Sequence, residues 1–291
     1  MKVKAYTLNT FAKSIEGGNA AGVVPNADSL SECEMRKIAA ILGFSETAFV
    51  MKSDRADFKV RFFTPNEEVD LCGHATIGTY FTLASLGYIK PGKYSQETGA
   101  GVLGIEVKRD LSIMMNQPVP VFYQTIDKEE IADSLGITAA EMPEDLPAQI
   151  VSTGLKDIMV PIRNMAALNS IVPDLKKIEE ISRRYNAVGY HVFTLESLCC
   201  STAHCRNFAP LYGIPEESAT GTSNGALACY LFKYGKIDCG RAGSIVFEQG
   251  YTMKKPSEIL VSLAVEGEEI LEVRVGGKAL NLSAIEVELD R

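Results

Sequence analysis

An internal repeat constrains the fold of this chain more than any other feature of its sequence. Arg61-Phe-Phe-Thr-Pro65 returns as Arg206-Asn-Phe-Ala-Pro210, and residues 73–89 align without a gap with residues 221–237. The matched features are a strand, a turn, a helix start and a helix end, in the same order. A repeat period of this length is far too long for a solenoid and predicts two similar domains.

Each copy of the repeat is typical of a strand, a proline-marked turn and a helix that begins at glycine. In the first copy, residues 61–63 form the strand, and an apolar helix is expected from Cys72-Gly73-His74 to about Leu86. A small residue at a helix N-terminus leaves backbone N–H groups free at the positive end of the helix dipole. Two such N-termini facing one cleft would bind an anion such as a carboxylate.

Composition and charge narrow the classes of partner. The 291 residues allow two domains of ordinary size, and the net charge of −8, without a Lys/Arg cluster longer than a pair, argues against nucleic-acid binding. Neither a signal-peptide pattern nor a long uninterrupted apolar run is found, and the seven cysteines lack a disulfide-scaffold spacing. We expect a cytoplasmic protein that binds a small molecule and has neither nucleic acid nor a membrane as a partner.

Domain boundaries follow from the order of the expected elements. Prolines within residues 118–120 mark the change between an N-terminal domain, residues 1–118, and a C-terminal domain, residues 119–279. A final alternating segment within residues 280–291 is expected to cross back to the first domain's sheet. Residues 17–22 are expected to form a glycine-rich loop without the dinucleotide fingerprint, either as a plain turn or as part of the cleft wall.

Three residues near the first repeated helix could move protons. His74, the second residue of the helix, can place its ring in the cleft. Cys72 precedes Gly73, where a helix N-terminus favours the thiolate, although a buried and inert thiol is an equal alternative. Glu46 lies between a short polar pair and an apolar strand, so its carboxylate is either solvated or directed into a pocket.

Two further clusters allow competing interpretations. Residues 67–70 and 216–217 bring carboxylates close in sequence to both helix N-termini, where they would orient a base at His74 or Thr222, or remain as solvated charge. Residues 199–205 contain three cysteines and a histidine, which are zinc-ligand types. Adjacent cysteines on a strand converge poorly on a tetrahedron, and Cys-x-x-Cys spacing is absent from the sequence. We therefore expect no metal.

Three motifs together resemble the phenazine-biosynthesis PhzF-like family. They are Phe63-Thr-Pro-Asn-Glu-Glu-Val-Asp-Leu-Cys-Gly-His-Ala-Thr-Ile-Gly78, Ser45-Glu-Thr-Ala-Phe-Val50 and Ala219-Thr-Gly-Thr222, and the resemblance covers essentially the whole chain. It implies the diaminopimelate-epimerase-like fold of class α+β. In that fold, two pseudo-symmetric domains each have a rolled, barrel-like, mostly antiparallel sheet around a central helix. It also implies a homodimer.

The resemblance implies roles for individual residues. The family's proton-transfer glutamate corresponds to Glu46, and its active-site aspartate and serine are replaced by Glu217 and Thr222. The family's Gly-Asn-Pro segment corresponds to residues 18–20. The implied catalytic residues are Glu46, His74 and Glu217, and the implied substrate-binding residues are Asn19, Cys72, Gly73, Ala75, Thr220, Gly221 and Thr222.

The resemblance implies a cofactor-independent isomerase that moves a proton on a small carboxylic acid in the interdomain cleft. Glu46 would take the proton and return it to another carbon, while His74 and Glu217 hold the substrate or assist. Two alternatives remain open. One is an epimerase, racemase or dehydratase of an amino or hydroxy acid with Cys72 as the base; the other is a non-catalytic protein that binds small acids.

Overall fold

The computed structural model describes residues 1–289 and divides the chain into two compact units. Unit 1 comprises Met1–Asn116 with Gly276–Arg291, and unit 2 comprises Gln117–Val275. The last two positions of the predicted segment 280–291, Asp290 and Arg291, lie outside the described residues.

Unit 1 is a mainly antiparallel sheet with one helix outside it and one inside it. Its elements are β1 (Lys2–Thr10), β2 (Asn19–Val24), α1 (Glu32–Leu42), β3 (Thr47–Met51), β4 (Phe58–Phe63), β5 (Glu68–Val69), α2 (Gly73–Ser85), β6 (Gly92–Thr98), β7 (Gly101–Val107), β8 (Ile113–Gln117) and β18 (Ala279–Glu288). Paired strands run in the order β18, β1, β2, β3, β4, β6, β7, β8, and the β2–β3 and β4–β6 pairs are parallel. β5 pairs with β4.

Unit 2 repeats this order of pairing. Its elements are β9 (Val121–Thr125), α3 (Lys128–Leu135), η1 (Ala139–Glu141), β10 (Gln149–Ser152), β11 (Lys156–Pro161), α4 (Met165–Ser170), α5 (Leu175–Tyr185), β12 (Tyr190–Thr194), β13 (Ala203–Ala209), η2 (Pro210–Tyr212), β14 (Ile214–Glu217), α6 (Gly221–Lys233), β15 (Ile245–Gln249), β16 (Ser257–Glu266) and β17 (Glu269–Gly277). Strands pair in the order β9, β10, β11, β12, β13, β15, β16, and the parallel pairs β11–β12 and β13–β15 correspond to those of unit 1.

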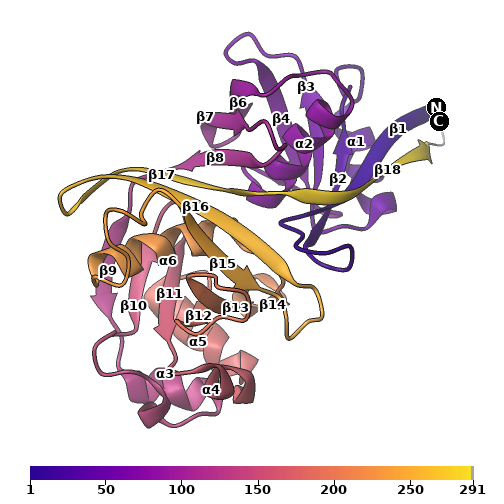
Figure 1. Ribbon diagram of the computed structural model, residues 1–291. Coiled ribbons are helices and arrows are strands. Elements are labelled where there is room, and N and C mark those ends of the chain that lie inside the picture. The colour runs from indigo at the N-terminus through magenta and orange to yellow at the C-terminus, as the bar shows by residue number, and fades with distance from the viewer. Residues whose placement is uncertain (290–291) are drawn as a thin grey trace. The chain divides into compact units, whose positions relative to one another are not determined.

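The two central helices, α2 and α6, match residue for residue. Each is buried along almost its whole length, because it is apolar or small-sided on every face and strands surround it. Helix α2 contacts β1, β2, β3, β7 and β18, whereas α6 contacts β10, β11, β12 and β16. Figure 1 shows each of these helices inside its own set of strands. Gly87 and Gly235 follow the two helices with positive φ angles of 75° and 67°, as the repeat predicted.

The repeated arginines serve the same structural purpose in both units. Arg61 on β4 binds Glu68 on β5 through two hydrogen bonds of 2.7 and 2.6 Å. Arg206 on β13 binds Glu216 on β14 in the same way, at 2.9 and 3.0 Å. Two of the carboxylates near the helix N-termini are therefore engaged by arginine, and they hold each turn against its strand.

The predicted fold class is confirmed: the protein is α+β, with two similar units that each enclose a central helix. The expected loop at residues 17–22 is wrong in part, since Asn19 already begins β2. Pairing of Thr10 with Asn19 and of Leu8 with Ala21 brings this glycine-containing segment into the sheet despite its weak strand propensity. Among residues 1–289, no helix has the length and apolar content needed to cross a membrane.

Candidate active site

Glu46 is positioned by the start of β3. Helix α1 ends at Gly43, which has a left-handed conformation, and the backbone then turns so that the Gly22 N–H donates to the Glu46 carbonyl at 3.3 Å. A Cβ on Gly22 would lie 2.7 Å from Thr47 Oγ1, so the close approach of β2 and β3 depends on glycine there. The Glu46 side chain is only 21% exposed.

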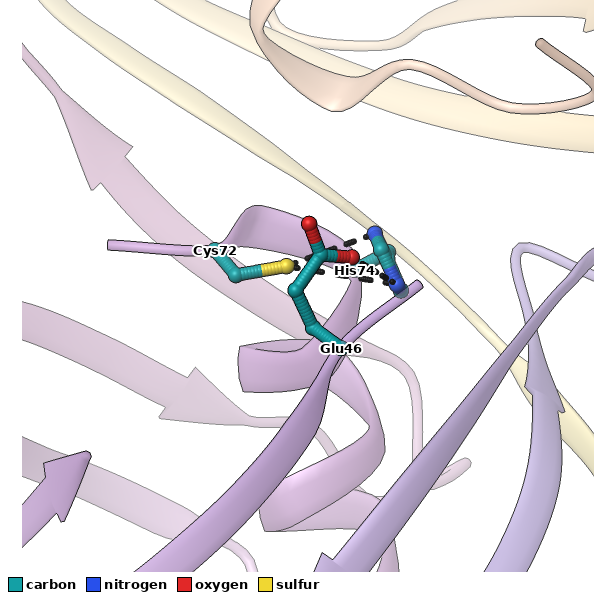
Figure 2. Close-up of side chains that lie close together, drawn as sticks. All are labelled: Glu46, Cys72 and His74. Atoms are coloured by element: carbon teal, nitrogen blue, oxygen red, sulfur yellow. Dashed lines mark hydrogen bonds and ion pairs between the residues drawn. The ribbon is translucent and has the colours of Figure 1, made fainter. Parts of the chain in front are cut away.

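The N-terminus of α2 brings two more candidate residues to Glu46. Cys72 is the N-cap residue, Gly73 begins the helix, and His74 is buried as its second residue. Figure 2 shows the Cys72 sulfur, the Glu46 carboxylate and the His74 imidazole pointing toward one another. His74 Nε2 lies 3.3 Å from Glu46 Oε2, and Cys72 Sγ lies 3.4 Å from His74 Nδ1. One ring therefore contacts a carboxylate and a thiol.

The His74 ring is neutral at pH 7. Burial lowers the pKa of His74 below 6.5, and the smaller opposing influence of the Glu46 carboxylate does not overcome it. Glu46 Oε2 is itself buried and accepts no aligned hydrogen bond from residues 1–289, although it lies close to His74. A carboxylate with so little hydrogen bonding next to a neutral imidazole is suited to accept a proton from a bound molecule.

The two central helices differ from the other helices in how they begin. Helices α1, α3, α4 and α5 each have an N-cap side chain that accepts a hydrogen bond from the first turn, from Ser31, Asp127, Asn164 and Asp174 respectively. Cys72 and Thr220, the N-cap residues of α2 and α6, make no such bond. The first N–H groups bonded within these helices belong to Thr76 and Asn224. The three preceding N–H groups of each helix have no partner within it.

The candidate residues of unit 2 gather at the start of α6. Glu217 ends β14, and its carboxylate accepts a hydrogen bond of 2.5 Å from Thr220 Oγ1. Gly221 and Thr222 form the first turn of the helix, and the Thr222 carbonyl accepts a hydrogen bond from Thr153 at 3.2 Å. The structure thus joins Glu217 to Thr220 directly, with Gly221 and Thr222 next to them in the chain.

Two further predicted residues, Asn19 and Ala75, lie in unit 1. Asn19 is half-buried at the start of β2, and its carbonyl accepts a hydrogen bond of 3.0 Å from Thr10 Oγ1. Ala75 is fully buried as the third residue of α2, so its methyl group packs inside unit 1. What Ala75 can offer a ligand is its backbone N–H group.

Gln249 and Asn224, which the sequence analysis did not identify, support the Glu217 end of the site. Gln249 Nε2 donates to the Glu217 carbonyl at 2.8 Å and to Thr220 Oγ1 at 3.1 Å. Asn224 Nδ2 donates to Gln249 Oε1 and to the Thr220 carbonyl. Because Thr220 Oγ1 accepts from Gln249, its own proton is directed at Glu217. Both amides are fully buried, and that unusual placement becomes visible only in the structure.

The same network continues inward to a buried carboxyl group. His191 Nε2 lies 3.2 Å from Asn224 Oδ1, and Asn207 Nδ2 lies 3.2 Å from both His191 Nδ1 and Ser223 Oγ. Ser223 then donates to Asp157 at 2.8 Å. Burial lowers the pKa of His191 to about 4 and raises the pKa of Asp157 to about 7. His191 is therefore neutral, with its proton on Nε2 if the Asn207 amide donates to Nδ1.

Known proteins resemble the chain over its whole length. The family model described as phenazine biosynthesis-like protein, PhzC–PhzF, matches residues 8–284. An uncharacterized isomerase of Clostridium acetobutylicum is 37% identical over 290 residues, which cover 96% of each chain. The trans-2,3-dihydro-3-hydroxyanthranilate isomerase of Pseudomonas chlororaphis is 27% identical over 280 residues, covering 94% of this chain and 95% of that protein.

Solved structures also superpose on the chain over almost its whole length. The Bacillus anthracis phenazine biosynthesis protein of the PhzF family superposes with a TM-score of 0.89 at 32% identity, over 99% of this chain and 100% of the other. A hydroxyproline epimerase of Agrobacterium vitis superposes with a TM-score of 0.63 at 13% identity, over 98% of this chain and 91% of that one. The second likeness concerns the fold alone, which is the diaminopimelate-epimerase-like fold.

Proposed function

The chain belongs to the PhzC–PhzF family of phenazine biosynthesis-like proteins, a family of isomerases, and we propose that it moves a proton on a small carboxylic acid without a cofactor. The observation that carries the proposal is the contact between the Glu46 carboxylate and the neutral His74 ring at the uncapped start of α2. It combines a proton acceptor with N–H groups that have no partner within helix α2 and that suit an anion.

In the proposed mechanism, the uncapped N-termini of α2 and α6 bind the substrate carboxylate. Glu46 removes a proton from a carbon activated by conjugation and returns it to another carbon, so the base is regenerated and no redox step is needed. His74, neutral at pH 7, donates to or accepts from the polar substituent next to the reacting carbon. We assign the same type of role to Glu217, which Thr220 orients from unit 2.

The alternative base is Cys72, which a specific contact supports. Its sulfur lies 3.4 Å from His74 Nδ1, close enough for the imidazole to accept the thiol proton. A Cys72-dependent reaction would be an epimerisation or a dehydration. Substitution separates the two hypotheses, because Glu46→Gln removes the carboxylate base and keeps the side-chain shape, whereas Cys72→Ser removes the thiol.

Proton NMR in heavy water tests the proposal. The purified protein is incubated with small unsaturated and amino carboxylic acids, among them trans-2,3-dihydro-3-hydroxyanthranilate, the substrate in the name of the Pseudomonas relative. We expect deuterium incorporation or a shifted double bond in the product. The rate of either reaction should fall by at least about 100-fold in Glu46→Gln. Glu180→Gln, a substitution of an exposed glutamate on α5, serves as the control and should retain the rate.

Two outcomes would contradict the proposed role of Glu46. Exchange that persists in Glu46→Gln and disappears in Cys72→Ser would assign the base to Cys72. Binding of a panel acid, detected by line broadening without any exchange or isomerisation, would instead favour the small-acid binding protein.

A further inference from the structure

Glu46, Cys72 and His74 together offer the ligand types that zinc prefers. One thiol sulfur, one imidazole nitrogen and one carboxylate oxygen all lie within 4.8 Å of one another. Zinc sites that keep an open position commonly use three protein ligands drawn from cysteine, histidine and acidic residues. Figure 2 shows that the three side chains approach a common point from two segments of unit 1.

The distances between these atoms are close to those of a tetrahedral site. Zn–S bonds of about 2.3 Å and Zn–N and Zn–O bonds of about 2.1 Å place neighbouring ligand atoms about 3.4 to 3.6 Å apart. Glu46 Oε2 lies 3.3 Å from His74 Nε2, and Cys72 Sγ lies 3.9 Å from the same nitrogen and 3.4 Å from Nδ1. Binding of one ion through Nε2 would require the Cys72 sulfur to move closer to that nitrogen.

The electrostatics of the cluster also favour a cation. Glu46 Oε2 is buried without an aligned hydrogen bond from the described residues, and His74 Nε2 lies 3.3 Å from it. Within residues 1–289, the side chain at ion-pair distance from Glu46 is that of His74, and no lysine or arginine lies that close. A Zn²⁺ ion would match the two negative charges of the Glu46 carboxylate and the Cys72 thiolate.

We propose that Glu46, Cys72 and His74 form a binding site for a thiophilic divalent cation, with Zn²⁺ as the preferred ion, whose occupation blocks proton transfer by Glu46. The Cys72 thiol releases one proton to solvent as the Zn–S bond forms, and the other two ligands bind through existing lone pairs. The binding site does not depend on the proposed function, but its inhibitory effect does, since an occupied carboxylate cannot accept a proton.

Direct measurement of metal binding tests the site without any substrate. Zn²⁺ is titrated into the reduced full-length protein in competition with a chromophoric chelator, and Co²⁺ is used in parallel as a spectroscopic probe. We expect one equivalent to bind, a thiolate-to-Co²⁺ charge-transfer band, and affinity reduced by at least about tenfold in Cys72→Ser, His74→Gln and Glu46→Gln. Circular dichroism confirms that each variant is folded.

Exposed thiols elsewhere in the chain require a matched control. Cys199 and Cys200 are adjacent and exposed, so the double variant Cys199→Ser, Cys200→Ser removes the pair most apt to bind zinc adventitiously. This variant should keep both the affinity and the Co²⁺ band. Loss of binding in the control, or unchanged binding in Cys72→Ser, would overturn the proposal.

A protection experiment on the unmodified protein covers the case in which Cys72→Ser does not fold. Cysteine alkylation is mapped by mass spectrometry with and without Zn²⁺. We expect Zn²⁺ to slow the alkylation of Cys72 and to leave that of Cys239 unchanged. Equal alkylation of Cys72 in both conditions would exclude the site. If an isomerase substrate is found, Zn²⁺ should inhibit its turnover reversibly. Tight Zn²⁺ binding without inhibition would disprove the proposed block of proton transfer by Glu46 but not the metal site.

Discussion

At the scale of single residues, burial decides the protonation states around both central helices. His74 and His191 are neutral because their rings are removed from water, and the Asp157 carboxyl holds its proton up to about pH 7 for the same reason. Asp157 is 2% exposed and receives one hydrogen bond, from Ser223. Its proton thus links the stability of unit 2 to pH.

The Asp157→Asn variant should become more stable than the natural protein as pH rises. The folded carboxyl has a pKa of about 7 and the unfolded one about 3.8, so the folded state binds the proton more tightly. The natural protein therefore loses stability between these pH values, and the neutral amide does not. The difference between the variant and the natural protein in free energy of unfolding, measured by urea unfolding, should be more favourable to the variant at pH 8 than at pH 4. We expect this change to be on the order of 3 kcal/mol.

Asp54→Asn, on an exposed turn, provides the control for this experiment and should give similar differences at both pH values. A pH-independent effect of Asp157→Asn would mean that this carboxyl does not change protonation between pH 4 and 8 in the folded protein.

At the scale of secondary-structure elements, the repeat preserves an arginine–glutamate pair that holds each turn against its strand. The surroundings of this pair differ between the units. The guanidinium of Arg61 lies over the Phe63 ring and that of Arg206 over the Phe208 ring, at 5.1 and 4.9 Å. The Arg206 side chain is 8% exposed and also donates to the carbonyls of Leu168 and Ile171, whereas the Arg61 side chain is 22% exposed.

Arg206→Ala should destabilise the protein much more than Arg61→Ala. Loss of Arg206 leaves Glu216 without its charge partner and two carbonyls without their donor, at a cost on the order of 3 kcal/mol. Loss of Arg61 breaks a more exposed pair and should cost about 1 kcal/mol or less. Chemical unfolding of the two variants side by side measures the difference. Equal costs would show that the contribution of the arginine–glutamate pair to stability does not depend on its burial.

The sequence predicted the starts of both central helices correctly, at Gly73 and Gly221, because glycine after a short polar turn is a local signal. It also paired Gly87 with Gly235. It did not predict that Asn19 is in a strand, since that depends on pairing with Thr10. Nor did it identify Gln249, whose hydrogen bonds reach residues 25 to 32 positions away.

At the scale of the whole molecule, the end of the chain completes the first unit. β18 pairs antiparallel with β1 from Lys2↔Glu288 to Thr10↔Ala279, and the two strands lie side by side in Figure 1. Val287 and Leu289 pack in the same hydrophobic cluster as Val3 and Ala5. Unit 1 therefore becomes complete only after all of unit 2 has been synthesised.

A chain that ends at Lys278 should not form a stable unit 1. Removing β18 exposes the backbone edge of β1 and takes away the Val287 and Leu289 side chains, each worth about 1.5 to 3 kcal/mol. Together the two side chains contribute about 3 to 6 kcal/mol, which reaches the lower end of the free energy of unfolding of an ordinary domain, roughly 5 to 15 kcal/mol. We expect aggregation, measured as soluble yield. A chain that ends at Leu289 is the control, and equal yields of both would contradict this account of β18.

The sequence alone determined the fold class, the presence of two similar units, the helix N-termini at Gly73 and Gly221, and the group of residues to inspect. These follow from local patterns, because glycine, proline and hydrophobic periodicity act within a few residues. Only the tertiary structure decided that the Glu46 carboxylate meets His74 and Cys72, that His74 is neutral, and that Glu217 is held by Thr220 and Gln249. Contacts and burial of this kind arise from residues far apart in the chain, and a local pattern does not specify them.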